Sequence, residues 1–312
     1  MGIGAGIQKA MKKGKSMNPR KKSAIKDFLC VVPALILIAL FTYYPIVELI
    51  KISFTDWNLL NDTWNYVGFK NWKWLFNGSG TKYLWNSLKV TLLYSIGELS
   101  ITLIGGMIFA LIFNRMTKTF AAMRAIVFMP KYVAMSSAAV VFLWILNTDT
   151  GILNYFLSLF GIAPVDWLGD RSTALISVLM VTGWRCIGYG MMVYLSAMMG
   201  ISTDYYEAAA LDGANSVQKF FKITIPMLSP TTLFLFVTTF LSSMKVFQSV
   251  DILTQGGPYR STEVFVYNIY RYAMEDFRMD RASTVAVFFF LLLLVITAAT
   301  MKIANKKVTY DS

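Results

Sequence analysis

The chain has 312 residues, with 29 lysines and arginines against 17 acidic residues, a formal net charge of +12 and a hydrophobic content of 56%. That content exceeds the roughly 45–50% of soluble domains. The lack of histidine excludes histidine-dependent nucleophiles, histidine zinc ligands and imidazole proton shuttles. Cys30 and Cys186 both lie in long apolar runs, which argues against a disulfide framework or a thiolate metal site. The composition indicates an integral membrane protein.

The predicted elements are helices that cross a membrane. About 20 mostly apolar residues span the ~30 Å hydrocarbon core as a helix, and six stretches approach or exceed that length. Glu98 interrupts the second stretch, while Lys131, Arg185 and Lys245 interrupt the third, fourth and fifth. Such runs fit helices better than barrel strands of ~10 alternating residues. We therefore expect an all-α membrane protein with six transmembrane helices, at residues 28–47, 90–113, 125–146, 173–199, 231–250 and 284–301.

Basic residues are distributed unevenly between the two sides of the predicted bundle. Taken together, segment 1–27, the second and fourth loops and the C-terminal tail hold 16 basic residues against five acids, whereas the other loops together hold ten of each. The positive-inside rule therefore places both termini and the loop 204–230 in the cytoplasm. The basic residues of segment 1–27 are Lys9, Lys12, Lys13, Lys15, Arg20, Lys21, Lys22 and Lys26.

Segment 1–27 invites two other interpretations. Residues 12–16 read KKGKS, which matches the end of a phosphate-binding loop, but position 9 is lysine where that motif requires glycine. The apolar run 28–47 is too long for the core of a cleaved signal peptide, and no small-residue cleavage site follows it closely. We therefore interpret the segment as a topology determinant that contacts membrane lipid, and we expect no nucleic acid partner.

The loop 204–230 has the pattern of two short helices. Asp204 followed by Glu207 predicts an N-cap with a capping-box partner, and Gly213 is placed to end the first helix. A second helix is expected to begin near Ser216 and to run until Pro226 stops it. Three consecutive alanines after Glu207 leave one side of the first helix without bulk, so that another protein can pack closely there.

This loop resembles a known signature. Glu207-Ala208-Ala209, three residues, Gly213, nine residues and Ile223-x-Ile225-Pro226 resemble the EAA---G---------I-LP motif of membrane subunits of binding-protein-dependent ABC importers, except that leucine is usual where Ile225 stands. The resemblance extends to the sugar-type, maltose- and glycerol-3-phosphate-like branch through three further stretches. They read FTYYPIVELIKISFTDWNLL at 41–60, GWRCIGYGMMVYLSAM at 183–198 and VFQSVDILTQGGPYRSTEVFVYNIYR at 246–271.

The resemblance implies a type I ABC importer transmembrane domain over residues 28–303, with a coupling loop at 204–230 and cytoplasmic tails at 1–27 and 304–312. The expected partners are a second homologous permease subunit, a cytoplasmic ABC ATPase dimer and an extracytoplasmic solute-binding protein. ATP and Mg would be bound by the ATPase, so that this chain would need no cofactor and would be a transport subunit rather than an enzyme. It would work by alternating access in the bacterial cytoplasmic (inner) membrane. The residues expected to couple to the ATPase are Glu207, Ala208, Ala209, Asp212 and Gly213.

Two other classes of protein are weaker interpretations than the importer. A self-contained secondary transporter would show paired internal repeats with discontinuous helices, and no clear repeat relates the two halves of the sequence. An intramembrane enzyme would need a catalytic constellation, which Glu98 and the acids of the outer loops do not form. The importer therefore remains the favoured class.

The candidate substrate path consists of polar and aromatic residues inside the predicted spans. Glu98 and Arg185 lie at similar depth, and an ion pair between them is the favoured expectation over contact of Arg185 with substrate. Lys131 follows Pro130 and is expected to snorkel or to satisfy a kinked backbone. The other candidates, each left open between substrate contact and packing, are Trp184, Tyr189, Lys245, Gln248 and Asp251.

The solute itself is only broadly predicted. The resemblance implies a sugar, an oligosaccharide or a related polyol. Three cations inside the spans against Glu98 leave room for an anionic solute such as a uronate or a glycerophosphate, although acids of the partner permease would balance these charges equally well.

Overall fold

The computed structural model describes residues 19–115 and 117–307. The chain divides into two compact units, Met1–Lys51 and Ile52–Ser312. Both are helical, and the described part of the chain adds one isolated bridge between Thr55 and Tyr66. Of the predicted basic tail, Lys9, Lys12, Lys13, Lys15 and the KKGKS stretch lie outside the described residues, as does the end of the C-terminal tail.

A nearly continuous helix makes up the described part of the first unit. α2 (Pro19–Ile38) passes through a π turn at Ala39–Tyr43 into α3 (Tyr44–Ile52). The π turn ends two residues before Pro45, whose ring and missing N–H disturb the regular α turn that precedes it. The apolar stretch Phe28–Ile52 is long enough to cross a membrane, so the predicted span 28–47 extends further than expected.

Three helical stretches of the second unit could cross a membrane without a sharp bend. Two further candidate spans are helix pairs, bent by 102° between Tyr132 and Met135 and by 61° between Met227 and Ser229. With each bent pair counted as one span, the described residues contain six, as predicted. The unbent stretches are α5 (Gly80–Ser100) with a π turn (Ile101–Gly105) and α6 (Gly106–Ile112), α10 (Ala174–Met199), and the first part of α17 (Met279–Lys307).

Both bends coincide with proline. Pro130 lies in the 3₁₀ turn Met129–Tyr132, which separates α7 (Lys118–Phe128) from α8 (Met135–Ile145). Pro226 and Pro230 flank the second bend, where α13 (Ile225–Met227) meets α14 (Ser229–Ser243). Proline lacks an N–H and its ring clashes with the preceding turn, so helices kink or break there.

The fifth span ends earlier than the sequence predicts. α14 stops at Ser243, and α15 (Gln248–Leu253) begins only after an irregular segment that contains Lys245. The predicted continuous helix over 231–250 is therefore wrong.

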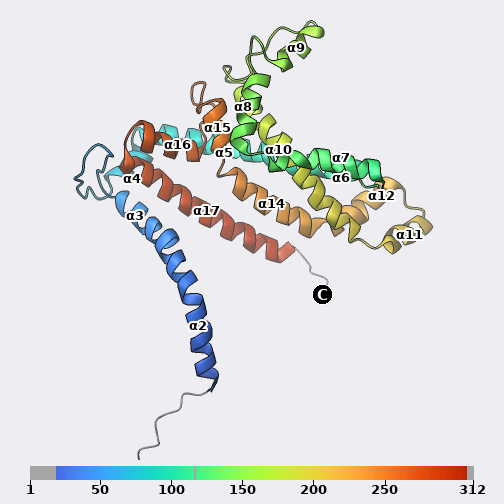
Figure 1. Cartoon of the computed structure of the whole chain (residues 1–312), viewed down its shortest axis with the longest axis horizontal. Coiled ribbons are helices and arrows are strands. Elements are labelled where there is room, and N and C mark those ends of the chain that lie inside the picture. The colour runs from blue at the N-terminus through green and yellow to red at the C-terminus, as the bar shows by residue number, and fades with distance from the viewer. Residues whose placement is uncertain (1–18, 116, 308–312) are drawn as a thin grey trace, which may run out of the picture. The chain divides into compact units, whose positions relative to one another are not determined.

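α10 packs closely against its neighbours α5, α6 and α7 (Figure 1). A Cβ on Gly190 would overlap the backbone carbonyl of Thr102, and a Cβ on Gly188 would overlap that of Val127. Small residues at such points let two helix backbones approach closely. Buried apolar side chains, among them Met191 and Leu235, fill the space around this contact.

The first member of the second bent pair begins with α12 (Ser216–Lys219) and a π turn (Phe220–Thr224). The remaining helices are short and lie in the connections between spans. They are α4 (Lys70–Asn77), α9 (Ile152–Leu159), α11 (Thr203–Leu211), and α16 (Phe265–Tyr270) with a π turn (Arg271–Glu275).

Candidate functional site

The loop between α10 and α14 begins with α11, whose N-cap is Ser202. The Ser202 hydroxyl accepts a hydrogen bond from the Asp204 N–H at 3.2 Å. The predicted N-cap Asp204 is therefore wrong, because Asp204 already lies in the first helical turn. Its carboxylate stands near the positive end of the helix dipole, where a negative charge is stabilising.

Gly213 ends α11 as predicted. Its φ of +78° is left-handed, and a Cβ at this position would meet no atom within 4 Å, so conformation rather than space requires glycine. The Ala214 N–H donates to the Ala209 carbonyl at 2.9 Å, and the Gly213 N–H donates to the Ala210 carbonyl at 3.1 Å. These two bonds form a Schellman motif, which satisfies the last carbonyls of the helix.

The second helix of the loop begins at Ser216, with Asn215 as its N-cap. The Asn215 side chain accepts from the Gln218 N–H at 2.8 Å, and the Gln218 side chain accepts from the Asn215 N–H at 2.9 Å, which is a capping box. The helix runs through Pro226 to Met227. The expectation that Pro226 stops it is wrong, because Pro226 lies in the first turn of a new α segment, where its missing N–H is tolerated.

The predicted coupling residues lie together on the surface of this loop. Glu207, Ala208, Asp212 and Gly213 are exposed, and Ala209 is half-buried. No ion pair of the described residues involves Glu207 or Asp212. Beside them is a hollow of about 350 Å³, lined by Ala209, Asp212, Gly213, Ala214, Gln218, Lys219, Lys222 and Ile223.

Leu211 is a loop residue that the sequence reasoning missed. Its side chain is 91% exposed and lies between the predicted coupling residues Ala209 and Asp212. A hydrogen bond of 2.9 Å between the hydroxyls of Tyr206 and Thr224 joins the two helices of the loop. The loop is therefore braced from inside and presents an apolar side chain outwards.

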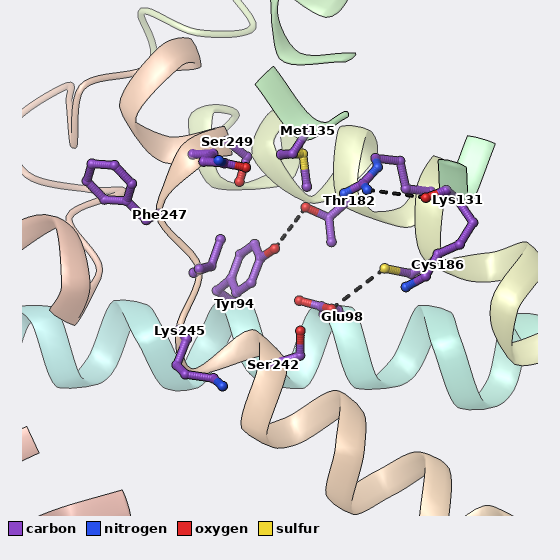
Figure 2. A pocket seen from close by; sticks show the side chains of 13 residues that line it. Tyr94, Glu98, Lys131, Met135, Thr182, Cys186, Ser242, Lys245, Phe247 and Ser249 are labelled. Atoms are coloured by element: carbon purple, nitrogen blue, oxygen red, sulfur yellow. Dashed lines mark hydrogen bonds between the residues drawn. The ribbon is translucent and has the colours of Figure 1, made fainter. Parts of the chain in front are cut away.

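A second candidate site is a cavity of about 410 Å³ within the second unit. Four elements line it: α5, the bend between α7 and α8, α10 and the break between α14 and α15 (Figure 2). An adjoining hollow of about 180 Å³ shares Glu98, Lys131, Cys186 and Ser242 with it. The polar residues that line the larger cavity are Tyr94, Glu98, Lys131, Thr182, Arg185, Cys186, Ser242, Lys245, Gln248 and Ser249.

The carboxylate of Glu98 is buried and faces α10. The Cys186 thiol donates to it at 3.7 Å, and one turn earlier on α5 the Tyr94 hydroxyl is 2.8 Å from that of Thr182 (Figure 2). Arg185 instead donates to the Lys131 backbone carbonyl at 3.4 Å. None of the ion pairs within the described residues joins Glu98 to Arg185. The expected ion pair between Glu98 and Arg185 is therefore wrong, because the bend after Pro130 exposes the Lys131 carbonyl and the Arg185 guanidinium donates its hydrogen bond to that carbonyl.

The structure brings some predicted path residues together and leaves others apart. Lys245 and Gln248 line the large cavity, and Tyr189 lines the adjoining hollow. Trp184 lies outside both and packs on Phe142, with ring centroids 5.6 Å apart. Asp251, on α15, is also absent from both linings.

Lys131, which the sequence predicted to snorkel or to satisfy a kinked backbone, lines the cavity. It lines both hollows, and its ammonium lies 4.6 Å from the centre of the Tyr189 ring. The preceding Pro130 indicated a bend in the helix. The sequence did not indicate which side chain would point into the cavity at that bend. Thr182 was detectable, since it lies three residues before Arg185 and four before Cys186, and these spacings place it beside each of them on a helix.

A polar cluster outside the spans surrounds the fully buried Glu263. Its carboxylate accepts from Asn268 at 2.6 Å and from Arg260 at 3.1 Å, and it also pairs with Arg271. Burial raises the pKa of Glu263, and Arg260 and Arg271 oppose that rise. Burial also acts to lower the pKa of Arg271, but the carboxylates of Glu263 and Glu275 outweigh it and raise that pKa. The pKa of each of these two side chains therefore depends on the charged neighbours in the cluster.

Comparisons with known proteins concern nearly the whole chain. The family described as "Binding-protein-dependent transport system inner membrane component" matches residues 102–310. The probable ABC transporter permease protein YurN of Bacillus subtilis is 32% identical over 285 residues, which are 90% of this chain and 96% of YurN. The sn-glycerol-3-phosphate transport system permease protein UgpA of Escherichia coli is 27% identical over 301 residues, 95% of this chain and 99% of UgpA.

One solved structure is similar over its whole length. It is the crystal structure of a bacterial ABC transporter involved in the import of the acidic polysaccharide alginate. The TM-score is 0.81 at 25% sequence identity, and the match covers 94% of this chain and 100% of that one.

Proposed function

The chain belongs to the family of inner-membrane components of binding-protein-dependent transport systems, and from that premise we propose that it forms, with a second homologous permease subunit, the translocation path for a sugar or oligosaccharide. The predicted family and the all-α type I importer fold are confirmed. The matched relatives are transport subunits rather than enzymes. UgpA carries the name of a phosphorylated polyol and the structural neighbour imports an acidic polysaccharide, which supports a solute of the sugar class.

The remaining partners follow from the same proposal. An ATPase dimer binds ATP and Mg and docks to the loop 204–230, and a solute-binding protein delivers the sugar from the opposite side. The loop and both tails, 1–27 and 304–312, face the cytoplasm, and the transmembrane domain occupies residues 28–303 of a chain in the bacterial inner membrane. The support for this orientation is the excess of basic residues in the two tails and in the second loop, which lies on the same side.

The observation that carries the proposal is the exposed surface of α11. Within the described residues, Glu207 and Asp212 form no ion pair. Leu211 is 91% exposed and offers an apolar side chain to a cleft on a docked protein. Acidic groups of this kind pair with arginine or lysine on a docked protein. The small residues Ala208, Ala209 and Gly213 permit a close approach.

α14 provides a mechanical connection from this surface to the cavity. It starts at Ser229, directly after the bend near the end of the loop, and its last turn contains the cavity residue Ser242. The cavity residue Lys245 lies two residues beyond the helix end at Ser243. When ATP-driven closure moves the docked loop, α14 transmits that movement to the irregular segment 244–247. The cavity then opens alternately to either side.

A charge reversal at the docking surface tests the proposal. Glu207→Lys is expected to leave expression and ligand binding by the solute-binding protein intact, and to lower transport and the stimulation of the ATPase. Asp149→Lys is the matched control, because Asp149 is an exposed acid in the connection between α8 and α9. Wild-type transport by normally expressed Glu207→Lys would refute the docking role.

A further inference from the structure

We propose that the cavity selects an acidic sugar, and that Lys131, Arg185 and Lys245 form the cationic subsite that recognises its carboxylate or phosphate. This inference rests on the proposed function, since it assumes that the solute passes through the cavity. It names the chemical class of the solute, which the fold leaves open.

The charges that line the cavity do not balance. The three members of the cationic subsite face one carboxylate, Glu98. The ion pairs of the described residues include none of these four. Glu98 accepts a hydrogen bond from a thiol instead. The cavity therefore carries a positive excess that no carboxylate of the described chain neutralises by direct contact.

Each cation also retains free hydrogen-bonding capacity. Arg185 uses one donor on the Lys131 carbonyl, and its Nε is buried without a partner, although a guanidinium has five N–H donors. Lys131 lies over the Tyr189 ring, a contact that leaves its charge in place. The Lys245 ammonium has no ion pair within the described residues, and the residue is exposed.

Such an arrangement costs free energy unless an anion completes it. Charged side chains inside spans are expensive, and where they occur they mark pathways for substrates or ions. A guanidinium binds carboxylate and phosphate through two parallel hydrogen bonds, whereas an ammonium acts as a point charge. An acidic solute would supply the missing counter-charge and would satisfy the buried Nε of Arg185.

The rest of the cavity suits the neutral part of a sugar. Tyr94, Thr182, Ser242 and Gln248 offer hydroxyl and amide groups. A volume of about 410 Å³ lies within the usual range for sites that hold small organic ligands. Charged groups and neutral hydrogen-bonding groups would thus both be within reach of one ligand in this cavity.

The cationic subsite is also placed where the protein can rearrange. Lys131 lies at the bend between α7 and α8, and Lys245 lies in the break after α14. Arg185 comes from the unbroken α10. A movement of α14 therefore changes the distance of Lys245 from Arg185, so the anion would be held in one state and released in the other.

The test uses the complete complex in proteoliposomes, with its binding protein outside and ATP at the ATPase. Two matched probe pairs are compared: a galacturonate disaccharide with the galactose disaccharide, and glycerol 3-phosphate with glycerol. Wild-type complex is expected to take up the acidic member of one pair at least about tenfold faster than its neutral counterpart. The pair that is transported distinguishes carboxylate from phosphate.

Variants then assign the selectivity to the cationic subsite. Arg185→Gln and Lys245→Gln are each expected to lower uptake of the acid about tenfold or more, the usual loss when a charged hydrogen-bond partner is removed. Lys89→Gln is the control, since Lys89 is a residue of α5 outside the cavity lining. Lys245 is exposed and lies outside any helix, so Lys245→Gln keeps the test valid should Arg185→Gln fail to assemble.

Three results would overturn the proposal. Faster uptake of the neutral members by wild type would refute the acidic solute and leave the proposed function standing. Unchanged uptake of the acid by assembled Lys245→Gln and Arg185→Gln would refute the cationic subsite. Absence of ATP-dependent uptake of all four probes by the assembled wild type would count against the proposed function itself and, with it, against this inference.

Discussion

The guanidinium of Arg185 donates to the backbone carbonyl of Lys131 and not to the carboxylate of Glu98. This contact ties the unbroken α10 to the bend between α7 and α8. It leaves Glu98 with a thiol as its side-chain donor. Within the described residues, no two charged side chains of the cavity therefore form an ion pair with each other.

The first prediction concerns this separation. In a double-mutant cycle of Arg185→Met and Glu98→Gln, the coupling free energy is expected to stay below about 1 kcal/mol, because the two groups do not touch. A buried ion pair would instead lose about 3–5 kcal/mol when either partner is removed, and the double variant would recover much of that loss. Thermal unfolding of the purified complex measures the coupling, and strong recovery would contradict the contact described.

The second prediction is topological. In a variant lacking Cys30 and Cys186, Asn215→Cys is expected to resist a membrane-impermeant thiol reagent in intact cells, since residues 204–230 are proposed to be cytoplasmic. Asp149→Cys is expected to react, because the connection between α8 and α9 is proposed to lie outside. Labelling after lysis controls for accessibility, and both positions are exposed. Reaction of position 215 in sealed cells would invalidate the orientation.

The third prediction separates backbone strain from coupling. Gly213 and Gly161 both have positive φ, +78° and +71°, and a Cβ added to either would meet no atom within 4 Å. Alanine at either site is expected to cost about 1–2 kcal/mol, the penalty of a left-handed non-glycine residue. Only Gly213→Ala should lower ATPase stimulation, because Gly161 lies outside the loop 204–230. Equal stimulation in the two variants would argue against a coupling role for Gly213.

The fourth prediction addresses the contact of α10 with α6 and the π turn before it. Gly190→Ala would push a methyl group into the Thr102 carbonyl, so that a loss of about 1–3 kcal/mol is expected, as for overpacked cores. Gly200→Ala, at the end of the same helix, is the control, because a Cβ there would lie 3.4 Å from the Ala197 carbonyl, an ordinary contact. Thermal unfolding of both variants is compared, and equal stability would mean that the backbones do not approach so closely.

The fifth prediction compares the loss of stability when either of two acids, Glu263 or Glu275, is removed from the cluster around Glu263. Glu263→Ala is expected to cost about 3–5 kcal/mol, because Arg260 loses its carboxylate and Arg271 loses one of two inside a buried site. Glu275→Ala should cost about 1 kcal/mol or less, since Glu275 is 42% exposed and Arg271 keeps Glu263. The order of the two melting temperatures is the measurement, and a reversed order would contradict the described burial.

Several features of this protein could be predicted from the sequence because they depend on local chemistry. The spans depend on the length of apolar runs, which a membrane requires whatever the neighbours are. Gly213 ends its helix because only glycine adopts a left-handed conformation at little cost. The spacing from Glu207 to Pro226 sufficed to indicate the family of transporters, since it belongs to one contiguous loop.

Other features were decided only by the tertiary structure. The bend after Pro130 sets which group reaches Arg185, and the end of α14 at Ser243 removes Lys245 from the helix on which the sequence placed it. Ser202 rather than Asp204 caps α11, because the last turn of α10 and the short connection after it fix where the new helix starts. Contacts between helices depend on their rotation, bending and separation, and these are settled by packing across residues far apart in the chain. Apolar length and local spacing therefore determined the number of spans and the loop, while packing alone determined which charges face one cavity.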